Sequence, residues 1–265
     1  MALTAEGAAL TEAHRLGQLA VAAKAAAAAT NMWDELEASR LDATSPLWLA
    51  RSLRVVQRFN AQSASLAQRY VPMYRDAELG SSAGRVVAPE FELGETSDAL
   101  LVAGPVRVKL LTRGGMTGDA AHASALTKFT GIVRRQVLSG GRMLIYATTK
   151  SDSRAIGWRR KTDGNPCAFC AMLASRGPVY GSRERAEQIG GTGLHFHGHC
   201  GCTAEIIYGE WKPSDAEQRY IEEYDKAARL ADAAGEPRTQ QTVLYRMRNN
   251  GVFRDSPLSR NTTTA

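Results

Sequence analysis

Every cysteine of this 265-residue chain lies in one of two short clusters, and this feature limits the possible folds more than any other. Cys167 and Cys170 belong to the sequence NPCAFC, and Cys200 and Cys202 end the run HFHGHCGC. That run also holds three of the five histidines. Because cysteine and histidine are the usual ligands of structural zinc, the clusters predict that two separate segments fold around one site.

The spacing within each cluster suits a tetrahedral metal ion. Two residues separate Cys167 from Cys170, so a tight turn can present both thiolates to one ion, and His197 and Cys200 repeat this spacing. The predicted zinc ligands are Cys167, Cys170, His197 and Cys200, with Cys202 in place of His197 as the second choice.

More donors are present than a tetrahedron needs. In an extended strand, alternation would place His195, His197 and His199 on one face and the two cysteines on the other. His197 and Cys200 would then need a turn to reach one ion, and Gly198 can supply it. Which of His195, His197, His199 and Cys202 completes the site stays open at this stage.

Three other states of the cysteines compete with structural zinc. The chain has no apolar run of the roughly 20 residues that span a bilayer and no signal-peptide pattern, so we expect synthesis in a cytoplasm, where disulfides rarely persist. Two disulfides formed later, and buried thiols without metal, remain alternatives. A catalytic zinc is disfavoured because no H-E-x-x-H pattern exists and four protein ligands would close the coordination sphere.

The N-terminal third predicts a helical hairpin at residues 1–80. Leu10, Val21, Met32 and Leu36 are spaced by whole helical turns and predict a helix over about 4–39. Ser45 and Pro46 suit the start of a second helix. Its apolar stripe is Trp48, Val55, Phe59, Leu66, Tyr70 and Met73, which we interpret as core or as a partner surface.

The rest of the chain predicts a smaller C-terminal α/β module. The composition of residues 80–100 predicts a linker, and residues 99–112 predict a strand. A helix is expected over 117–139, with Gly140 and Gly141 ending it. Residues 142–149 could form a helix or a strand. Ser214 and Glu217 form a capping-box pattern for a helix up to Gly235, and a short helix near 240–249 precedes a disordered tail. The expected fold is mainly α (α+β), with regions 1–80, 81–152, 153–235 and 236–265.

The charge is mildly basic, with a formal net charge of +6. In GWRRK, an aromatic side chain stands beside three cations next to the cysteines, which suits contact with a phosphate backbone. The candidate nucleic-acid-binding residues are Trp158, Arg159, Arg160 and Lys161, and a solvated helix or strand face is the alternative interpretation. We interpret His122 as an ordinary helix-face histidine. A serine nucleophile site with Ser124 or Ser139 is the alternative interpretation, for which no third member is visible.

The stretch GWRRKTDGNPCAFCAMLASRGPVY followed by HFHGHCGC resembles the C-terminal module of Mu F-like minor head proteins of tailed bacteriophages, especially those of actinobacterial phages. The resemblance covers about 65 residues strongly, and the helical N-terminal part matches only in general character. In the terms of that family, the signature positions are Cys167, Cys170, His197, Cys200 and Cys202. His199 departs from the asparagine that many members carry.

This resemblance implies a non-enzymatic minor capsid protein of the virion head, assembled in the host cytoplasm. Its implied partners are the phage portal protein and the major capsid protein, with phage DNA as a further contact and no membrane association. Two other functions remain open, a capsid maturation protease that would depend on His122 and a zinc-knuckle nucleic-acid-binding module.

Overall fold

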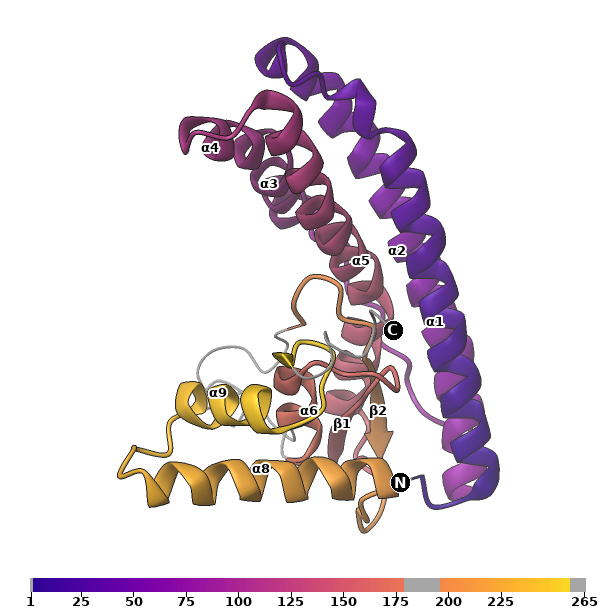
Figure 1. Cartoon of the computed structure of the whole chain (residues 1–265). Helices are drawn as coiled ribbons and strands as arrows, with labels where there is room; N and C mark the ends of the chain where they lie inside the picture. Colours follow the sequence, from indigo (N-terminus) through magenta and orange to yellow (C-terminus); the bar gives the residue numbers. More distant parts are fainter. Residues whose placement is uncertain (1, 179–195, 258–265) are drawn as a thin grey trace.

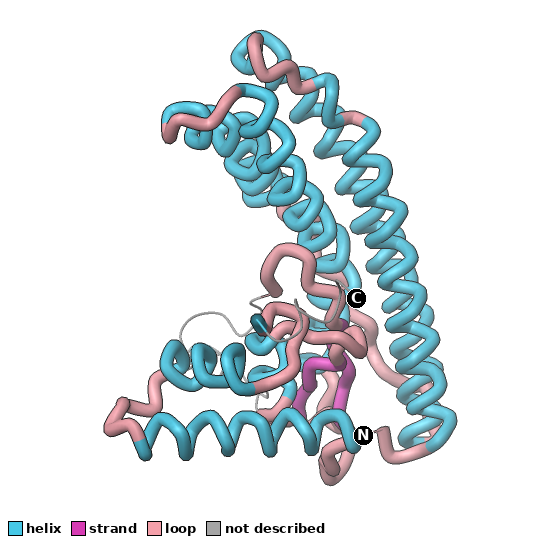
Figure 2. Tube along the Cα trace, in the orientation of Figure 1, coloured by secondary structure: helices cyan, strands magenta, loops and turns pink. Residues whose placement is uncertain are grey.

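The computed structural model describes residues 2–178 and 196–257. They are mostly helical, with a single two-stranded sheet in the described part of the chain, which confirms the α+β fold class (Figure 2). The elements in chain order are α1 (Ala5–Asn31), η1 (Trp33–Glu35), α2 (Leu41–Leu79), α3 (Leu93–Leu101), η2 (Val102–Val106), α4 (Arg107–Arg113), α5 (Gly118–Ser151), β1 (Gly157–Lys161), α6 (Ala168–Ala174), β2 (Thr203–Ile207), α8 (Asp215–Ala233) and α9 (Gln240–Asn250).

Three long helices, α1, α2 and α5, pack together along their lengths (Figure 1). The predicted hairpin of α1 and α2 exists, but α5 lies against both of its helices, so the unit is a three-helix bundle. Glu78, in the last turn of α2, accepts hydrogen bonds from the backbone N–H groups of Leu3 and Thr4. This contact holds the start of α1 beside the end of α2.

The prediction that Gly140 and Gly141 end a helix is wrong, because α5 continues through both to Ser151. The two glycines instead let α5 approach the other helices. A Cβ atom at Gly140 would overlap the backbone carbonyl of Asn60, and one at Gly141 would lie 2.5 Å from Nε2 of Gln18. Local sequence cannot distinguish a helix stop from such a helix crossing.

A buried polar layer surrounds this crossing. Gln18 Nε2 donates to the carbonyl of Ser63 at 2.9 Å, and Ser63 Oγ donates back to Gln18 Oε1 at 2.6 Å. Asn60 Nδ2 donates to the carbonyl of Gln136 at 2.8 Å. Because each amide needs its own partner, the layer fixes the relative positions of the three helices.

The buried face of α1 consists of small and polar residues: Gly7, Thr11, His14, Gln18, Ala22, Ala25 and Ala29. They repeat at steps of three and four, whereas the predicted apolar residues Leu10, Val21 and Met32 lie beside this face and are half-buried. Small side chains allow the close packing that the polar layer requires.

Two helix boundaries differ from the sequence-based expectation. The first helix ends at Asn31 rather than near residue 39, and α2 begins at Leu41, so Ser45 does not cap it. Of the predicted α2 stripe, Trp48, Phe59 and Tyr70 are buried, while Met73 is exposed.

The strand predicted over residues 99–112 is wrong, because this segment is helical from α3 through η2 to α4. The helix is irregular at η2, because Gly104 and Pro105 interrupt the regular helical hydrogen bonds there. A Cβ at Gly104 would overlap the ring of Trp48, so the wide turn of η2 lets α2 pack closely. Helix α3 also replaces the end of the predicted 80–100 linker.

The C-terminal module is built on β1 and β2, which pair antiparallel with Arg159 opposite Glu205. Helices α6, α8 and α9 pack together beside this sheet (Figure 1). The predicted capping box is present, since Ser214 Oγ accepts from the Glu217 N–H and the Glu217 carboxylate accepts from the Ser214 N–H.

The module shares a core with one end of the bundle. This shared core includes Tyr70 and Tyr74 of α2, Ile145 of α5 and Trp158 of β1, together with all four cysteines. The module is therefore continuous with the bundle in its packing. The predicted disordered tail falls, from residue 258 on, outside the described residues, and no described helix has the length and apolar character needed to cross a bilayer.

Candidate metal centre

The first pair of cysteines is placed by a helix N-terminus. Cys167 is the N-cap of α6, and its Sγ accepts a hydrogen bond from the backbone N–H of Cys170 at 3.4 Å. The helical turn that follows brings the Cys170 side chain back toward Cys167. The C-x-x-C spacing thus produces the local turn that the sequence predicts.

The second segment turns at Gly198. The Cys200 N–H donates to the His197 carbonyl at 3.2 Å, which closes the turn, and Cys202 follows just before β2. His199 takes a left-handed backbone conformation, with a φ of 62°. This turn removes the strand-like alternation of faces, so His197 and Cys200 point to the same site.

The predicted ligands converge around the Cys170 thiol. Cys170 Sγ lies 3.2 Å from Nε2 of His197 and 3.5 Å from Sγ of Cys200, and Cys167 Sγ lies 3.0 Å from the same His197 nitrogen. The ligand atoms of Cys167, Cys170 and His197 all lie within 4.8 Å of one another, and so do those of Cys170, Cys200 and Cys202. Bonds of about 2.0–2.3 Å to zinc place tetrahedral ligand atoms about 3.5–3.8 Å apart. Each group of three is therefore close to the size that one ion needs, and Cys170 belongs to both groups.

Two of the thiols are strongly acidic in this environment. Hydrogen bonds from Cys170 and His197 lower the pKa of Cys167 to about 4. Hydrogen bonds from Cys170 and Cys202, with the positive charges of Arg142 and Arg160, lower the pKa of Cys200 well below its usual value. Each of the two segments therefore supplies a thiolate, which is the form that binds metal.

The second ring nitrogen of His197 is also used. His197 Nδ1 lies 2.6 Å from the Gly198 carbonyl oxygen, an acceptor, so Nδ1 carries the proton. With the Nδ1 proton held in this way, loss of the Nε2 proton leaves the Nε2 lone pair directed at the thiols, as metal binding requires. A ligand histidine in a metal site is held in this way.

Two buried arginines surround the cluster. Arg142 of α5 donates to the carbonyl oxygens of Cys200 and Cys202, at 2.8 Å and 2.6 Å for its Nη2. The guanidinium groups of Arg142 and Arg160 lie 3.8 Å and 3.9 Å from the ring centroid of Phe196. Arg160 also approaches Sγ of Cys200 at 3.8 Å. Buried cations at these positions offset the negative charge of several thiolates.

The structure thus brings together all five predicted metal residues and separates His199 from them. His199 Nε2 lies 2.8 Å from the carbonyl oxygen of Thr127, and its ring packs against Gly131 of α5. It attaches the loop to the bundle instead of facing the thiols. His195 lies outside the described residues.

The burial of Trp158, Arg159 and Arg160 contradicts the prediction that they contact nucleic acid. All three are at most 2% exposed, and only Lys161 is half-buried. Arg159 forms ion pairs with Glu205 at 2.7 Å and with Glu217. These acidic partners lie far along the chain, which is why the sequence segment by itself looks like a basic surface.

The positions of His122, Ser124 and Ser139 do not fit the alternative of a serine nucleophile site. His122 Nε2 bonds to the Leu36 carbonyl oxygen at 2.7 Å, and its ring packs against Trp33. Ser139 lies 17 residues further along the same helix, about 25 Å away, and Ser124 is exposed on a different side of α5. The histidine therefore has a structural role at the end of the bundle.

Two residues of the centre were missed by sequence reasoning. Arg142 begins the apolar run RMLIY, and a charged residue at the start of a buried helical segment was the signal that could have identified it. Phe196 lies between two histidines and gave no comparable signal.

Comparison with known proteins places this fold in a phage context. A family model described as VG15 protein matches residues 7–227, which include the bundle and both cysteine clusters. The chain is also 35% identical over 88 residues to a protein named Gene 15 protein from Mycobacterium phage D29. That match covers 32% of this chain and 30% of the relative's length. No solved structure matches.

Proposed function

The chain belongs to the VG15 protein family, and we propose that it is a structural protein of a bacteriophage head in which a bound zinc ion fastens the C-terminal module to the helical bundle. Its membership in the VG15 family and its similarity to a phage protein support the assignment of this chain as a phage component. The resemblance of its cysteine region to Mu F-like minor head proteins supports the more specific assignment to the head.

The contact of Arg142 with the cysteine loop carries the fastening part of this proposal. Arg142 belongs to α5 of the bundle, and it donates to the carbonyl oxygens of both Cys200 and Cys202. Cys167 caps α6 and Cys170 belongs to it, and α6 packs on β1 and on α8. An ion shared by both pairs would therefore join the module's helix to the loop that the bundle holds.

The donor set favours zinc over harder cations. Thiolate and imidazole ligands suit zinc, whereas magnesium and calcium prefer oxygen. The four cysteines are buried and lie in two groups around Cys170, and the ion's contribution in this proposal is structural. It supplies the cross-link, and the chain's own arginines offset the charge.

The metal part is tested by elemental analysis of full-length protein prepared under reducing conditions. We expect about one zinc per chain, and the variant Cys170→Ser should lose it, because this thiol belongs to both ligand groups. Cobalt substitution provides the second readout, since intense thiolate-to-cobalt bands count the sulfur ligands. Metal-free wild-type protein, or two disulfides found by mass spectrometry, would contradict the proposal.

The head assignment is tested by co-expression with the portal protein and the major capsid protein of the same phage. We expect full-length protein to co-purify with one of them and to be found in purified heads. His122→Ala should assemble normally, since this histidine only bonds within the bundle end. If instead the protein cleaves capsid or scaffold precursors and His122→Ala stops the cleavage, the maturation protease is the correct function.

A further inference from the structure

The middle of the three-helix bundle contains no acidic residue. Residues 13–33 of the α1 segment, 43–75 of α2 and 120–151 of α5 hold neither aspartate nor glutamate. The chain has 27 acidic residues in 265, so about nine would be expected in three segments of this total length. The same segments carry twelve lysines and arginines. The basic residues of these segments are therefore separated along the chain from the acidic residues.

The exposed cations of α2 form one line. Arg51, Arg54, Arg58 and Arg69, here called the basic stripe, follow one another at steps of three, four and eleven residues, which are whole numbers of helical turns. All four are exposed. The line spans about 27 Å at 1.5 Å per residue.

Most of the basic stripe lacks an acidic partner. Arg51, at one end, pairs with Glu35 at 2.7 Å. Arg54, Arg58 and Arg69 form no ion pair with the residues that the structure describes. Arg69 donates only to the neutral Ser65 hydroxyl at 3.1 Å. The ordinary explanation of surface charge, a mixed and mutually paired face, does not apply here.

Helix α8 shows that the chain builds such mixed faces elsewhere. Its exposed residues include both acidic and basic side chains, and Lys226 lies 4.0 Å from Glu223. The mixed face of α8 shows that an acid-free surface is not a feature of every exposed helix in this chain.

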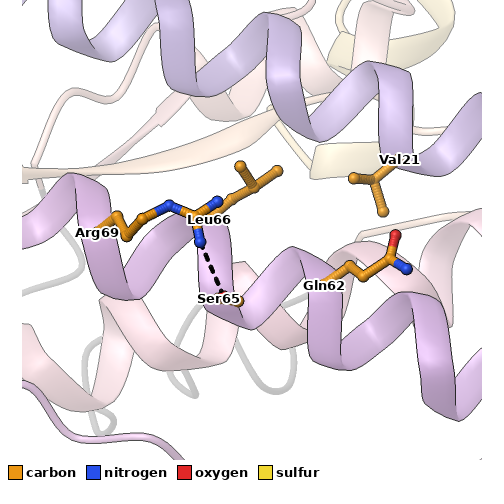
Figure 3. A pocket seen from close by; sticks show the side chains of 5 residues that line it. All are labelled: Val21, Gln62, Ser65, Leu66 and Arg69. Carbon is orange, nitrogen blue, oxygen red and sulfur yellow. Dashed lines mark hydrogen bonds between the residues drawn. The ribbon is translucent and has the colours of Figure 1, made fainter.

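The groove beside the stripe is shallow, and its lining combines polar side chains with the apolar Val21 and Leu66. Figure 3 shows Gln62, Ser65 and Arg69 along α2, facing Val21 of α1 across a hollow. Lys24, one turn further along α1, is exposed and adds another cation near this side. The polar groups offered here are guanidinium, amide, hydroxyl and ammonium, all of which donate hydrogen bonds, and they lie beside the apolar side chains of Val21 and Leu66.

We propose that the basic stripe of α2 binds the phosphate backbone of double-stranded DNA. Phosphate contacts come mainly from arginine, lysine, serine and glutamine side chains, which are the types present here. A length of about 27 Å runs beside about eight base pairs at 3.4 Å per pair. An acidic protein is less well matched, because protein interfaces depend on a core of aromatic and apolar side chains, and the exposed Leu47 and Met73 lie beyond the two ends of the stripe.

The test measures binding of full-length protein to a fluorescent 30-base-pair DNA duplex by anisotropy over a range of salt concentrations. The triple variant Arg54→Gln, Arg58→Gln and Arg69→Gln should weaken binding about tenfold or more. The plot of log affinity against log salt concentration should be less steep for this variant than for wild type, by about 2–3 in the magnitude of the slope, since each lost phosphate contact contributes about 0.9.

The matched control is the triple variant Arg154→Gln, Arg219→Gln and Arg229→Gln, which removes the same charge from exposed positions outside the bundle. It should bind within about twofold of wild type. Equal weakening by both triple variants would overturn the proposal, because only net charge would then matter. Absence of duplex binding by wild type at low salt would also overturn it, as would binding to polyglutamate in preference to DNA. None of these outcomes depends on the metal centre.

Discussion

Gly140 of α5 lies directly against the backbone of Asn60 of α2, with no room between them for a Cβ atom. Gly140→Ala must therefore separate the two helices. The expected cost is about 2–3 kcal/mol, typical of an overpacked core, and the melting temperature should fall by roughly 4–12 °C.

The control for this change is Gly94→Ala. Gly94 is also helical, but a Cβ there meets no atom within 4 Å. Alanine is a better helix former than glycine by up to about 1 kcal/mol, so this variant should be neutral or slightly stabilised. Thermal unfolding monitored by circular dichroism compares the two. Equal melting temperatures would show that the helices do not meet at Gly140.

Arg142 provides a second prediction, on metal affinity. Replacing it with methionine removes the donors to the Cys200 and Cys202 carbonyls and one cation beside the thiolates. Loss of such a supporting contact typically lowers metal affinity 10- to 100-fold. Competition with a chromophoric zinc chelator measures this, and Arg135→Met, a half-buried arginine on the same helix, should leave the affinity unchanged. An unaltered affinity in Arg142→Met would mean that the arginine serves packing alone.

The cysteine site was predictable because its determinants are local. The C-x-x-C spacing of Cys167 and Cys170 fixes a helix-capping turn, and Gly198 permits the turn that brings His197 and Cys200 to the same side. Only the pairing of the two segments is long-range, and the scarcity of cysteine elsewhere indicated it. The choice among the histidines was not local, because it depends on the contact of His199 with α5.

The errors occurred where distant partners decide the structure. Gly140 looked like a helix end because the contact with Asn60 comes from another helix. Arg159 looked exposed because Glu205 and Glu217 are 46 and 58 residues away. The small and polar inner face of α1 gives weak apolar periodicity, so the more apolar adjacent face was chosen instead.

Arg159 supplies the third prediction. Its guanidinium is buried between Glu205 and Glu217, and Tyr74 Oη also donates to Glu205 at 3.2 Å. Arg159→Met would leave two buried carboxylates without their cation, which should cost about 3–5 kcal/mol. Denaturant unfolding measures the change. Arg154→Met, at an exposed position, should stay within about 0.5 kcal/mol of wild type.

A rescue variant separates lost charge from lost packing. Adding Glu205→Gln and Glu217→Gln to Arg159→Met makes the unpaired groups neutral, so part of the lost stability should return. If the triple variant is less stable than Arg159→Met, the packing of the arginine side chain matters more than its charge.

The fourth prediction concerns pH and His14. This residue is 7% exposed and stacks on Tyr70 with 4.3 Å between ring centroids, and burial lowers its pKa from 6.5 to about 4. Between pH 6.5 and 4 the unfolded chain therefore binds a proton that the folded chain does not. The stability that depends on neutral His14 is fully present above pH 6.5 and is lost as the pH falls. The free energy of unfolding should therefore decrease by about 2 kcal/mol between pH 7.5 and 5 because of this group.

His14→Phe tests this prediction because it keeps an aromatic ring against Tyr70 and removes the titrating group. The free energy of unfolding, measured in urea at pH 7.5 and pH 5, should fall with acidification by about 2 kcal/mol less in the variant than in wild type. His122→Phe is the matched control, since it makes the same substitution at a half-buried histidine that bonds to a carbonyl. The range above pH 5 avoids most carboxylate titration. Identical pH dependence in His14→Phe and wild type would mean that the His14 ring can be protonated within the bundle, and that α1 and α2 pack less tightly there than their stacked rings indicate.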